Sequence, residues 1–171
     1  PPRKAEVIDG YFTGTQNTGL GWIGFQNFDL VRAENPTMIG PAGYDPENDP
    51  SFPRGLCAYG CNAFQVTSPY MDNVAYAIIP ASGTRFTTVI GGSAFNCRHP
   101  VDPSTWADGI FVIGMQGARN YQSINAHPCF NLNYTDCNFV DEMQMPNMRC
   151  IGGSVTNCNV TIATGRATTG G

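Results

Sequence analysis

Apolar and polar residues alternate in short segments that are separated by Gly, Asn and Pro. The segment from Cys158 to Ile162 reads Cys-Asn-Val-Thr-Ile. A strand with this pattern points Cys158, Val160 and Ile162 inward, and Asn159 and Thr161 outward. Because such segments recur along the chain, the sequence predicts an all-β fold built from short strands.

These segments belong to an internal repeat. The stretch CFNLNYTDCNFV, from Cys129 to Val140, returns 21 residues later as CIGGSVTNCNVT. The frame I-G-G-S-x-x-N-C is shared by Ile90 to Cys97 and Ile151 to Cys158, which lie about three periods apart. A weaker copy, VIGMQGARNY from Val112 to Tyr121, lies between them. A fixed period of this size predicts stacked rungs.

A polar residue precedes the second cysteine of each copy. Asn96, Asp136 and Asn157 hold this position. Asn and Asp tolerate the left-handed backbone of a sharp corner, so these residues are expected at the corners between strands. If the corners lie over one another, their side chains form a ladder of hydrogen bonds.

The phrases IGGSVTNCNVTI and GIFVIGMQGARNYQSI resemble rungs of the right-handed parallel β-helix of pectate-lyase-like proteins. The resemblance covers roughly residues 70 to 165 and implies a β-solenoid with rungs of about 21 residues, or about eight coils in all. Proteins of this architecture include polysaccharide lyases, polygalacturonase-like hydrolases, adhesins and viral fibres, so it implies no single function. The alternative is a β-sandwich or jelly roll, in which the repeats are coincidental.

The length of 171 residues fits one domain, residues 1–171. Within it we expect an N-terminal segment (1–20), a loop excursion (32–62) and regular rungs (63–165). The loop is expected because Asn35 to Asn62 is dense in Pro and Gly and carries several acids. The chain begins at a proline without an initiator Met, which favours a fragment or a processed piece of a larger protein.

The composition limits the partners. An apolar content of 42% can fill a continuous core, whereas only 13% of residues are charged and the net charge is -4. The nine Lys and Arg residues form no cluster, which argues against nucleic acid or an anionic membrane as a partner. No apolar run approaches the length of a membrane span. A surface rich in Asn, Thr, Ser and Gln suits polysaccharide better.

Seven cysteines and two glycosylation sequons indicate an oxidising secretory route in a eukaryote. The sequons are Asn133-Tyr134-Thr135 and Asn159-Val160-Thr161. They predict N-linked glycans at Asn133 and Asn159, although either tripeptide also arises by chance. The expected location is extracellular or at the cell surface.

The repeat predicts a cysteine pairing. Neighbouring coils lie about 4.8 Å apart, a separation that disulfides accept. The offset of 21 residues therefore predicts bonds between Cys129 and Cys150 and between Cys137 and Cys158. A buried ladder of free thiols is one alternative, and local pairing of Cys137 with Cys150 is another.

The remaining cysteines are less constrained. Cys57 and Cys61 flank a short loop that a disulfide could close. Cys97 is then left over as a buried, free or intermolecular thiol, and burial is favoured because it aligns with the inward cysteines of the other copies. Zinc would need further ligands, and neither His99 nor His127 lies in a ligand pattern, so we expect no metal and no cofactor.

The candidate catalytic residues are few. The chain lacks the Asp-Asp, Gly-His-Gly and Arg-x-Lys elements of polygalacturonase-like hydrolases. If the protein is an enzyme, a lyase-like site would draw on Asp102, Asp108, Arg119 and His127, which spread over one rung and its loops. Each has a simpler explanation, since Asp108 can cap a turn, Arg119 can cover apolar wall and His127 lies on a loop.

The sequence alone therefore favours a glycosylated, extracellular structural or adhesive β-solenoid over an enzyme. Such a protein would assemble end to end, with copies of itself or a continuing parent chain as partners, into a filament or surface layer. The alternative is a polysaccharide-active β-helix enzyme, either a lyase or a glycoside hydrolase.

Overall fold

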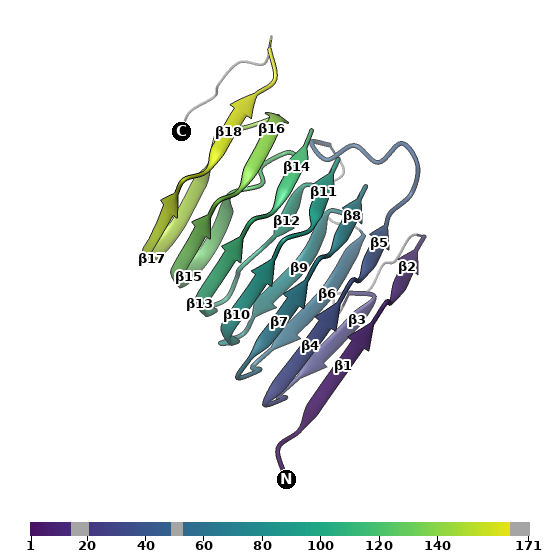
Figure 1. The fold of residues 1–171 in the computed structure, drawn as a ribbon, viewed down its shortest axis with the longest axis vertical. Helices are drawn as coiled ribbons and strands as arrows, with labels where there is room; N and C mark the ends of the chain where they lie inside the picture. Colours follow the sequence, from purple (N-terminus) through teal and green to yellow (C-terminus); the bar gives the residue numbers. More distant parts are fainter. Residues whose placement is uncertain (15–20, 49–52, 165–171) are drawn as a thin grey trace.

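The computed structural model describes residues 1–14, 21–48 and 53–164. Parts of the predicted N-terminal segment (1–20) and of the loop excursion (32–62) therefore lie outside the described residues, as do residues 165–171. The described chain contains no helix and winds as a parallel β-solenoid of about 6 turns (Figure 1). The predicted all-β solenoid is confirmed, and the alternative of a β-sandwich or jelly roll is wrong.

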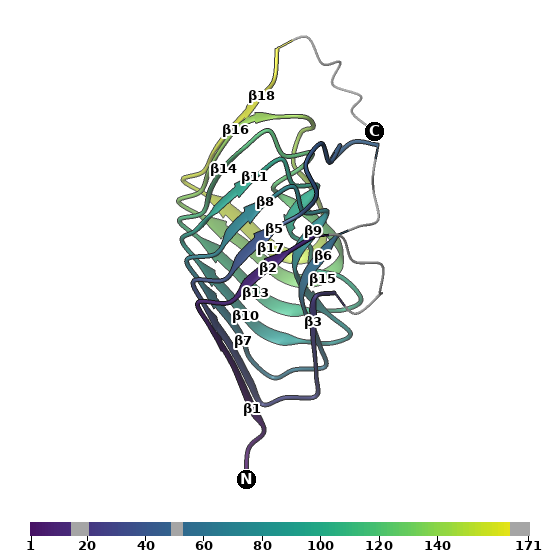
Figure 2. The same ribbon diagram turned by 90° about the vertical axis from the view of Figure 1, so that its right-hand side faces the viewer.

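Three parallel sheets form the walls of the solenoid, and the turns stack along its axis (Figure 2). Sheet A contains β1 (Lys4–Ile8), β4 (Leu30–Glu34), β7 (Phe64–Thr67), β10 (Arg85–Ile90), β13 (Asp108–Ile113), β15 (Asn125–Thr135) and β17 (Asn147–Thr156). Sheet B contains β2 (Tyr11–Thr13), β5 (Thr37–Ile39), β8 (Tyr70–Asp72), β11 (Ser93–Phe95), β14 (Gln116–Ala118), β16 (Asn138–Glu142) and β18 (Asn159–Ile162). Sheet C contains β3 (Ile23–Gln26), β6 (Arg54–Tyr59), β9 (Tyr76–Ala81) and β12 (His99–Val101).

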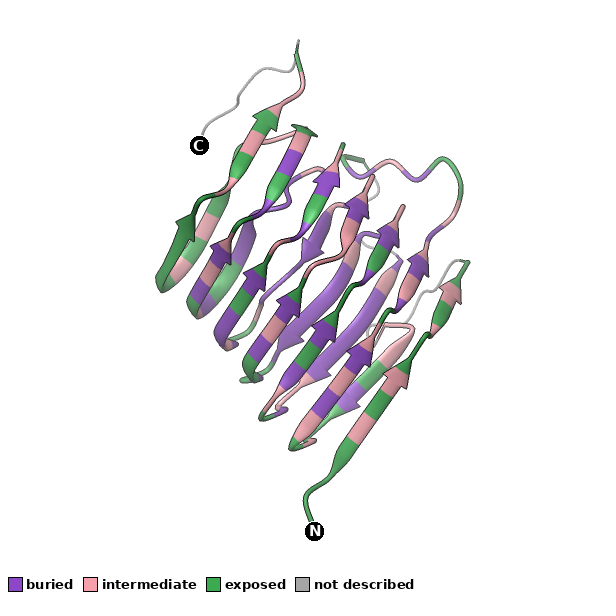
Figure 3. Ribbon diagram, viewed as in Figure 1, coloured by how far each residue is buried: buried purple, intermediate pink, exposed green. Residues whose placement is uncertain are grey.

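The interior is filled by side chains that occupy the same position in successive strands. In sheet A one such file runs through Ala33, Val66, Val89, Val112 and Tyr134, all of them buried. Alternate residues of these strands face solvent, which gives the banded colouring of sheet A in Figure 3. Apolar burial of this kind is the main stabilising contribution of the fold.

Residues with left-handed backbone separate the sheets, as the sequence predicts. At the corner between sheets A and B, Asp136 and Asn157 have φ angles of 54° and 52°, and the amide of Asn157 donates to the carboxylate of Asp136. At the corner between sheets B and C, Asn96 has a φ angle of 51°, and its amide donates to Asp72 at 2.9 Å. The predicted ladder of corner hydrogen bonds is confirmed at both corners.

Most turns are longer than the sequence period suggests. The predicted period holds between β15 and β17, where Asn133 pairs with Ser154. It is slightly exceeded in the preceding turns, where Val66 pairs with Val89 and Val89 with Val112. The turn from β4 to β7 is longer still, because it includes the loop between β5 and β6. The chain therefore makes about 6 turns and not about eight.

The two copies of the I-G-G-S-x-x-N-C frame do not occupy equivalent positions in the stack. Ile90 and Ile151 lie in strands of the same parallel sheet. Strand by strand, however, Ile90 pairs with Ile113, Ile113 with Thr135 and Thr135 with Thr156, so Ile90 is equivalent to Thr156 and not to Ile151. Asn96 follows sheet B, whereas Asn157 follows sheet A. The asparagines of the two copies therefore stand at two different corners, because each corner favours a residue that tolerates left-handed backbone.

The predicted loop excursion is too long. Residues 32–62 contain the end of β4 together with β5 and β6, and residues 1–20 contain β1 and β2. Two of the prolines on which the loop prediction rested lie next to strands. Pro36 directly precedes β5, and Pro53 directly precedes β6. Proline is compatible with the start of a strand, so its density here marks corners.

Arg98 holds the described part of the intervening loop against the solenoid. Its Nη1 donates to the carbonyl oxygens of Pro46 at 2.8 Å and Glu47 at 3.1 Å. Its guanidinium also lies 4.3 Å from the centroid of the Tyr121 ring.

In residues 1–14, 21–48 and 53–164 no helix is long and apolar enough to cross a membrane.

Candidate functional site

A cleft of about 360 Å³ lies on the outer face of sheet C. Its lining side chains come from four successive turns: Arg54, Tyr59, Tyr76, Ile79, Ala81, Ser82, Asp102, Ser104, Thr105 and His127. The register explains the hollow, because one outward file runs from Tyr59 through Ala81 and Ser104 to His127. Two short side chains in the middle of this file leave space between the larger groups at its ends.

Asp102 is a buried carboxylate in this cleft. It follows β12 directly, and its backbone amide donates to the carbonyl of Ile78 at 2.9 Å. Its side chain continues the outward file that Cys57 and Ile79 occupy in the preceding turns. The residue is 7% exposed, and burial raises the pKa of its carboxyl to about 6. An acid with this pKa changes its protonation state near neutral pH.

His127 lies beside Asp102 on the next turn. Its Nε2 is 3.4 Å from Oδ1 of Asp102, and Nδ2 of Asn125 donates to the same oxygen at 3.2 Å. The imidazole is half exposed, whereas the aspartate side chain is 9% exposed. A neutral His127 with its proton on Nε2, beside the carboxylate, keeps the lone pair on Nδ1. The pair thus combines a buried orienting acid with an accessible base.

His99 differs from His127 in its surroundings. It is buried, and its Nδ1 lies 3.0 Å from the carbonyl oxygen of Gln122, which can only accept. Nδ1 therefore carries the proton. Burial lowers the pKa of His99 to about 4, so its imidazole is neutral at physiological pH. The ring centroids of His99 and His127 are 6.4 Å apart.

Arg54 and Tyr76 line the cleft on the strands that precede His99. The three residues share one register position in β6, β9 and β12. The guanidinium carbon of Arg54 lies 5.6 Å from the centroid of the Tyr76 ring, and the rings of Tyr76 and His99 are also 5.6 Å apart. Burial raises the pKa of Tyr76 above its ordinary value, so its hydroxyl stays protonated at neutral pH. Arg54 therefore supplies a cation to the cleft, and Tyr76 supplies a phenolic proton.

The four catalytic candidates from the sequence separate in space. Asp102 and His127 meet in the cleft. Asp108 begins β13 of sheet A, where its Oδ1 accepts a hydrogen bond from Asn131 at 2.9 Å. Arg119 is exposed at the corner after β14, with a φ angle of 59°. The lyase-like grouping of all four is therefore wrong for Asp108 and Arg119, since neither lines the cleft.

Sequence reasoning missed Arg54 and Tyr76, which line the cleft, and His99, which packs against Tyr76. Arg54 falls within the loop excursion predicted from the sequence, and His99 stands there only as a residue outside any metal-ligand pattern. Their common signal is the spacing, because these three residues recur at nearly equal intervals along the chain and are register partners. Extending the repeat backwards without fixing its length would have aligned them.

All seven cysteines carry free thiols in the structure. Cys129 is the register partner of Cys150, and the backbone amide of Cys137 lies 3.4 Å from Sγ of Cys158, so both predicted pairs lie on adjacent turns. Their oxidation stays a prediction. Burial raises the pKa of Cys129 to about 12 and that of Cys137 to about 11.

The other three cysteines are buried. Cys57 packs with Ile79 in a small cluster on sheet C, whereas Cys61 packs in the main core, an arrangement that disfavours a bond between them. Cys97 is fully buried, as predicted, but it follows the corner after sheet B and does not align with Cys137. Burial raises its pKa to about 12.

Both predicted glycosylation positions are on the outer walls. Asn133 is half-buried near the end of β15, where its Oδ1 accepts from Ser154 at 2.9 Å. Asn159 is exposed at the start of β18, and its Nδ2 donates to Asn138 at 2.8 Å. Glycan attachment at either position stays a prediction.

The described residues contain no group of three or more His, Cys, Asp and Glu side chains that could hold a metal ion. Comparison with protein-family models, with curated proteins and with solved structures finds no match.

Proposed function

We propose that the cleft on sheet C binds a uronate-containing polysaccharide and cleaves it by β-elimination. The observation that carries this proposal is the contact between Asp102 and His127, because it joins a buried carboxylate of raised pKa to an accessible imidazole. Clefts with perturbed titratable groups are the usual places for acid–base chemistry.

The residues divide the reaction between them. Nδ1 of His127 takes the proton α to the uronate carboxylate, and Arg54 neutralises the charge that develops on that carboxylate. The electrons of the broken C–H bond form the new double bond, and the bond from the β carbon to the glycosidic oxygen breaks. The leaving oxygen takes a proton from the Tyr76 hydroxyl, so no oxidant or second substrate is needed.

A lyase fits this cleft better than a glycoside hydrolase. Hydrolases of the common type place two carboxyl groups on either side of the scissile bond. Among the described lining residues the only carboxylate is Asp102, and it is turned toward His127. A proton-abstracting base with a neighbouring arginine requires no second carboxylate.

Turnover of a panel of polyuronates tests the proposal, with the ultraviolet absorbance of the unsaturated product as readout. The wild-type protein should release unsaturated ends from at least one polyuronate and none from a neutral glucan. His127→Ala should lower kcat about 100-fold or more, as expected for loss of a general base, with little change in binding. Absence of product from every polyuronate would refute the proposal.

A second proposal, the structural role favoured by the sequence, is supported by the two ends of the described solenoid. β1 and β2 edge sheets A and B at one end, and β17 and β18 edge them at the other. Val155, which continues an inward file, is 47% exposed on β17. Edges of this kind pair readily with another strand, so copies would stack end to end in a glycosylated extracellular assembly.

Sedimentation velocity tests this second role. Val155→Lys places a charge over the open interior and should abolish assembly, whereas Thr156→Lys, which faces outward on the same strand, should leave it intact. A wild-type protein that stays monomeric at high concentration would exclude end-to-end stacking of this chain.

A further inference from the structure

The corner between sheets C and A carries an unusual residue. Trp106 has a φ angle of 64°, and Thr105 before it has a φ angle of 50°. One turn earlier the same position is held by Gly83, whose amide donates to the carbonyl of Thr105. Glycine adopts this backbone conformation without strain, whereas a bulky side chain does so only where the surroundings impose it.

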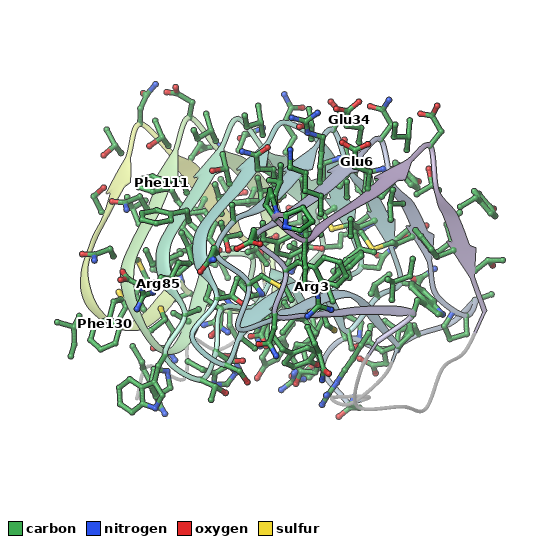
Figure 4. The ribbon with its side chains drawn as sticks, turned by 90° about the horizontal axis from the view of Figure 1, so that it is seen from below. Arg3, Glu6, Glu34, Arg85, Phe111 and Phe130 are labelled. Atoms are coloured by element: carbon green, nitrogen blue, oxygen red, sulfur yellow. The ribbon has the colours of Figure 1, made fainter. Side chains whose placement is uncertain are left out.

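The indole of Trp106 is presented to solvent on a rigid base. The residue is 59% exposed, and its ring stacks on that of Phe130 with centroids 5.7 Å apart and an interplanar angle of 28°. Its backbone amide donates to the carbonyl of Pro128 at 2.9 Å, which fixes the corner to β15. Phe130 projects from the periphery of the molecule in Figure 4. The outer face of the indole is therefore held flat and accessible.

This platform adjoins the cleft. Thr105 lines the cleft and is bonded directly to Trp106. On the next turn His127 lines the cleft, and Phe130 follows it in the same strand, β15. A chain that leaves the cleft over this corner must pass across the indole.

We propose that Trp106, supported by Phe130, is a stacking subsite for a pyranose ring of the polysaccharide that occupies the cleft. This inference rests on the proposed function and extends it from the reacting sugar to a neighbouring one. The apolar C–H face of a pyranose packs against a flat aromatic ring, and the negative face of the π system attracts those hydrogens. The occupant is a sugar and not a second protein copy, because the platform is continuous with a cleft lined by polar and charged groups.

The backbone supplies a sharp test. In Trp106→Gly the side chain is lost, but the left-handed conformation becomes unstrained, so the thermal midpoint should be equal to or higher than that of the wild type. Binding of a uronate oligosaccharide long enough to leave the cleft should weaken about tenfold, as for loss of one stacked aromatic contact. Phe86→Ala is the matched control, because Phe86 is 66% exposed with a φ angle of 47° but is not part of the stack.

The readouts separate the two proposals. A disaccharide that fills only the cleft should bind and react equally in the wild type, Trp106→Gly and Phe86→Ala. Equal affinity of all three proteins for the long oligosaccharide would overturn the subsite while leaving the lyase proposal intact. Loss of self-association in Trp106→Gly with unchanged sugar binding would assign the platform to protein contacts instead. Absence of any sugar binding by the wild type would overturn both proposals.

Discussion

Nε2 of His127 lies 3.4 Å from Oδ1 of Asp102, and the two residues come from successive turns of the solenoid. The parallel stack creates this contact, because the end of β12 and the start of β15 bring two outward files together on sheet C. The carboxylate is buried by the wall, whereas the imidazole reaches the cleft. The same regular scaffold therefore provides two very different environments for neighbouring groups.

The raised pKa of Asp102 predicts the acid side of the pH–rate profile. The ionised carboxylate is a stronger hydrogen-bond acceptor than the neutral acid, so it favours the tautomer of His127 that carries its proton on Nε2 and leaves Nδ1 as the base. Since burial raises the pKa of Asp102 to about 6, kcat/KM should fall as the pH is lowered through this value. Initial rates between about pH 5 and pH 8 measure the effect. A rate that rises on acidification would contradict the assignment.

Glu142 predicts an unusual dependence of stability on pH. It is 1% exposed, and it accepts hydrogen bonds from the Ser123 amide at 2.8 Å and from Asn120 Nδ2 at 3.1 Å. Burial raises its pKa from 4.5 to about 7. Because the folded pKa is raised, its contribution to stability is complete below about pH 4.5 and is lost as the pH rises through 7.

Urea unfolding at several pH values measures this contribution. A shift of this size corresponds to about 3 kcal/mol between the acidic and the neutral limits. Asp102 and His99 also titrate differently in the folded state, so the comparison must be made against Glu142→Gln. The free energy of unfolding of the wild type minus that of Glu142→Gln should fall as the pH rises, and a pH-independent value of this difference would show that Glu142 does not titrate in this range.

The register predicts which disulfides form on oxidation. Cys129 and Cys150 are direct partners between β15 and β17, so non-reducing peptide mapping should recover this pair. The raised pKa of Cys129 keeps its thiolate scarce at neutral pH, so oxidation of the folded protein should be slow and should speed up in mild denaturant. Recovery of a Cys137–Cys150 bond would contradict the stacking order.

The architecture was accessible from the sequence because it depends on local rules that repeat. Alternation sets the inward and outward positions of β18, and Asp or Asn marks corners such as those at Asp136 and Asn157. Where the repeat had its predicted length, as between Cys129 and Cys150, the predicted partners are the observed ones. Repetition reinforces each local preference, so errors of one position do not accumulate there.

The equivalence of positions in successive turns was harder to predict than the approximate length of the repeat. Two corners of each turn need the same left-handed residues, so a match between Asn96 and Asn157 does not reveal that they follow different sheets. The turns also vary in length, which hides the alignment of Arg54 with Tyr76 and His99. The site depends on this alignment, so its Arg54 end could not be found with a constant period.

The outer face of sheet A contrasts with the cleft. There Arg32 lies 3.8 Å from Glu6 and 3.9 Å from Glu34, with all three side chains about half exposed. Figure 4 shows Glu6 and Glu34 at the surface of the molecule. Exposed ion pairs of this kind contribute little to stability. Among the described residues, the cleft on sheet C joins a buried carboxylate to an accessible base.

The role of the Asp102–His127 pair is tested most directly by comparing two Asp→Asn variants. Asp102→Asn removes the carboxylate that faces His127, whereas Asp108→Asn removes one that lies on sheet A outside the cleft. The measurement is kcat/KM for release of unsaturated uronate, with thermal midpoints as a control for folding. We predict a loss of about 100-fold or more for Asp102→Asn and wild-type activity for Asp108→Asn. Equal activity of the two variants would contradict the assignment of the site to the Asp102–His127 pair.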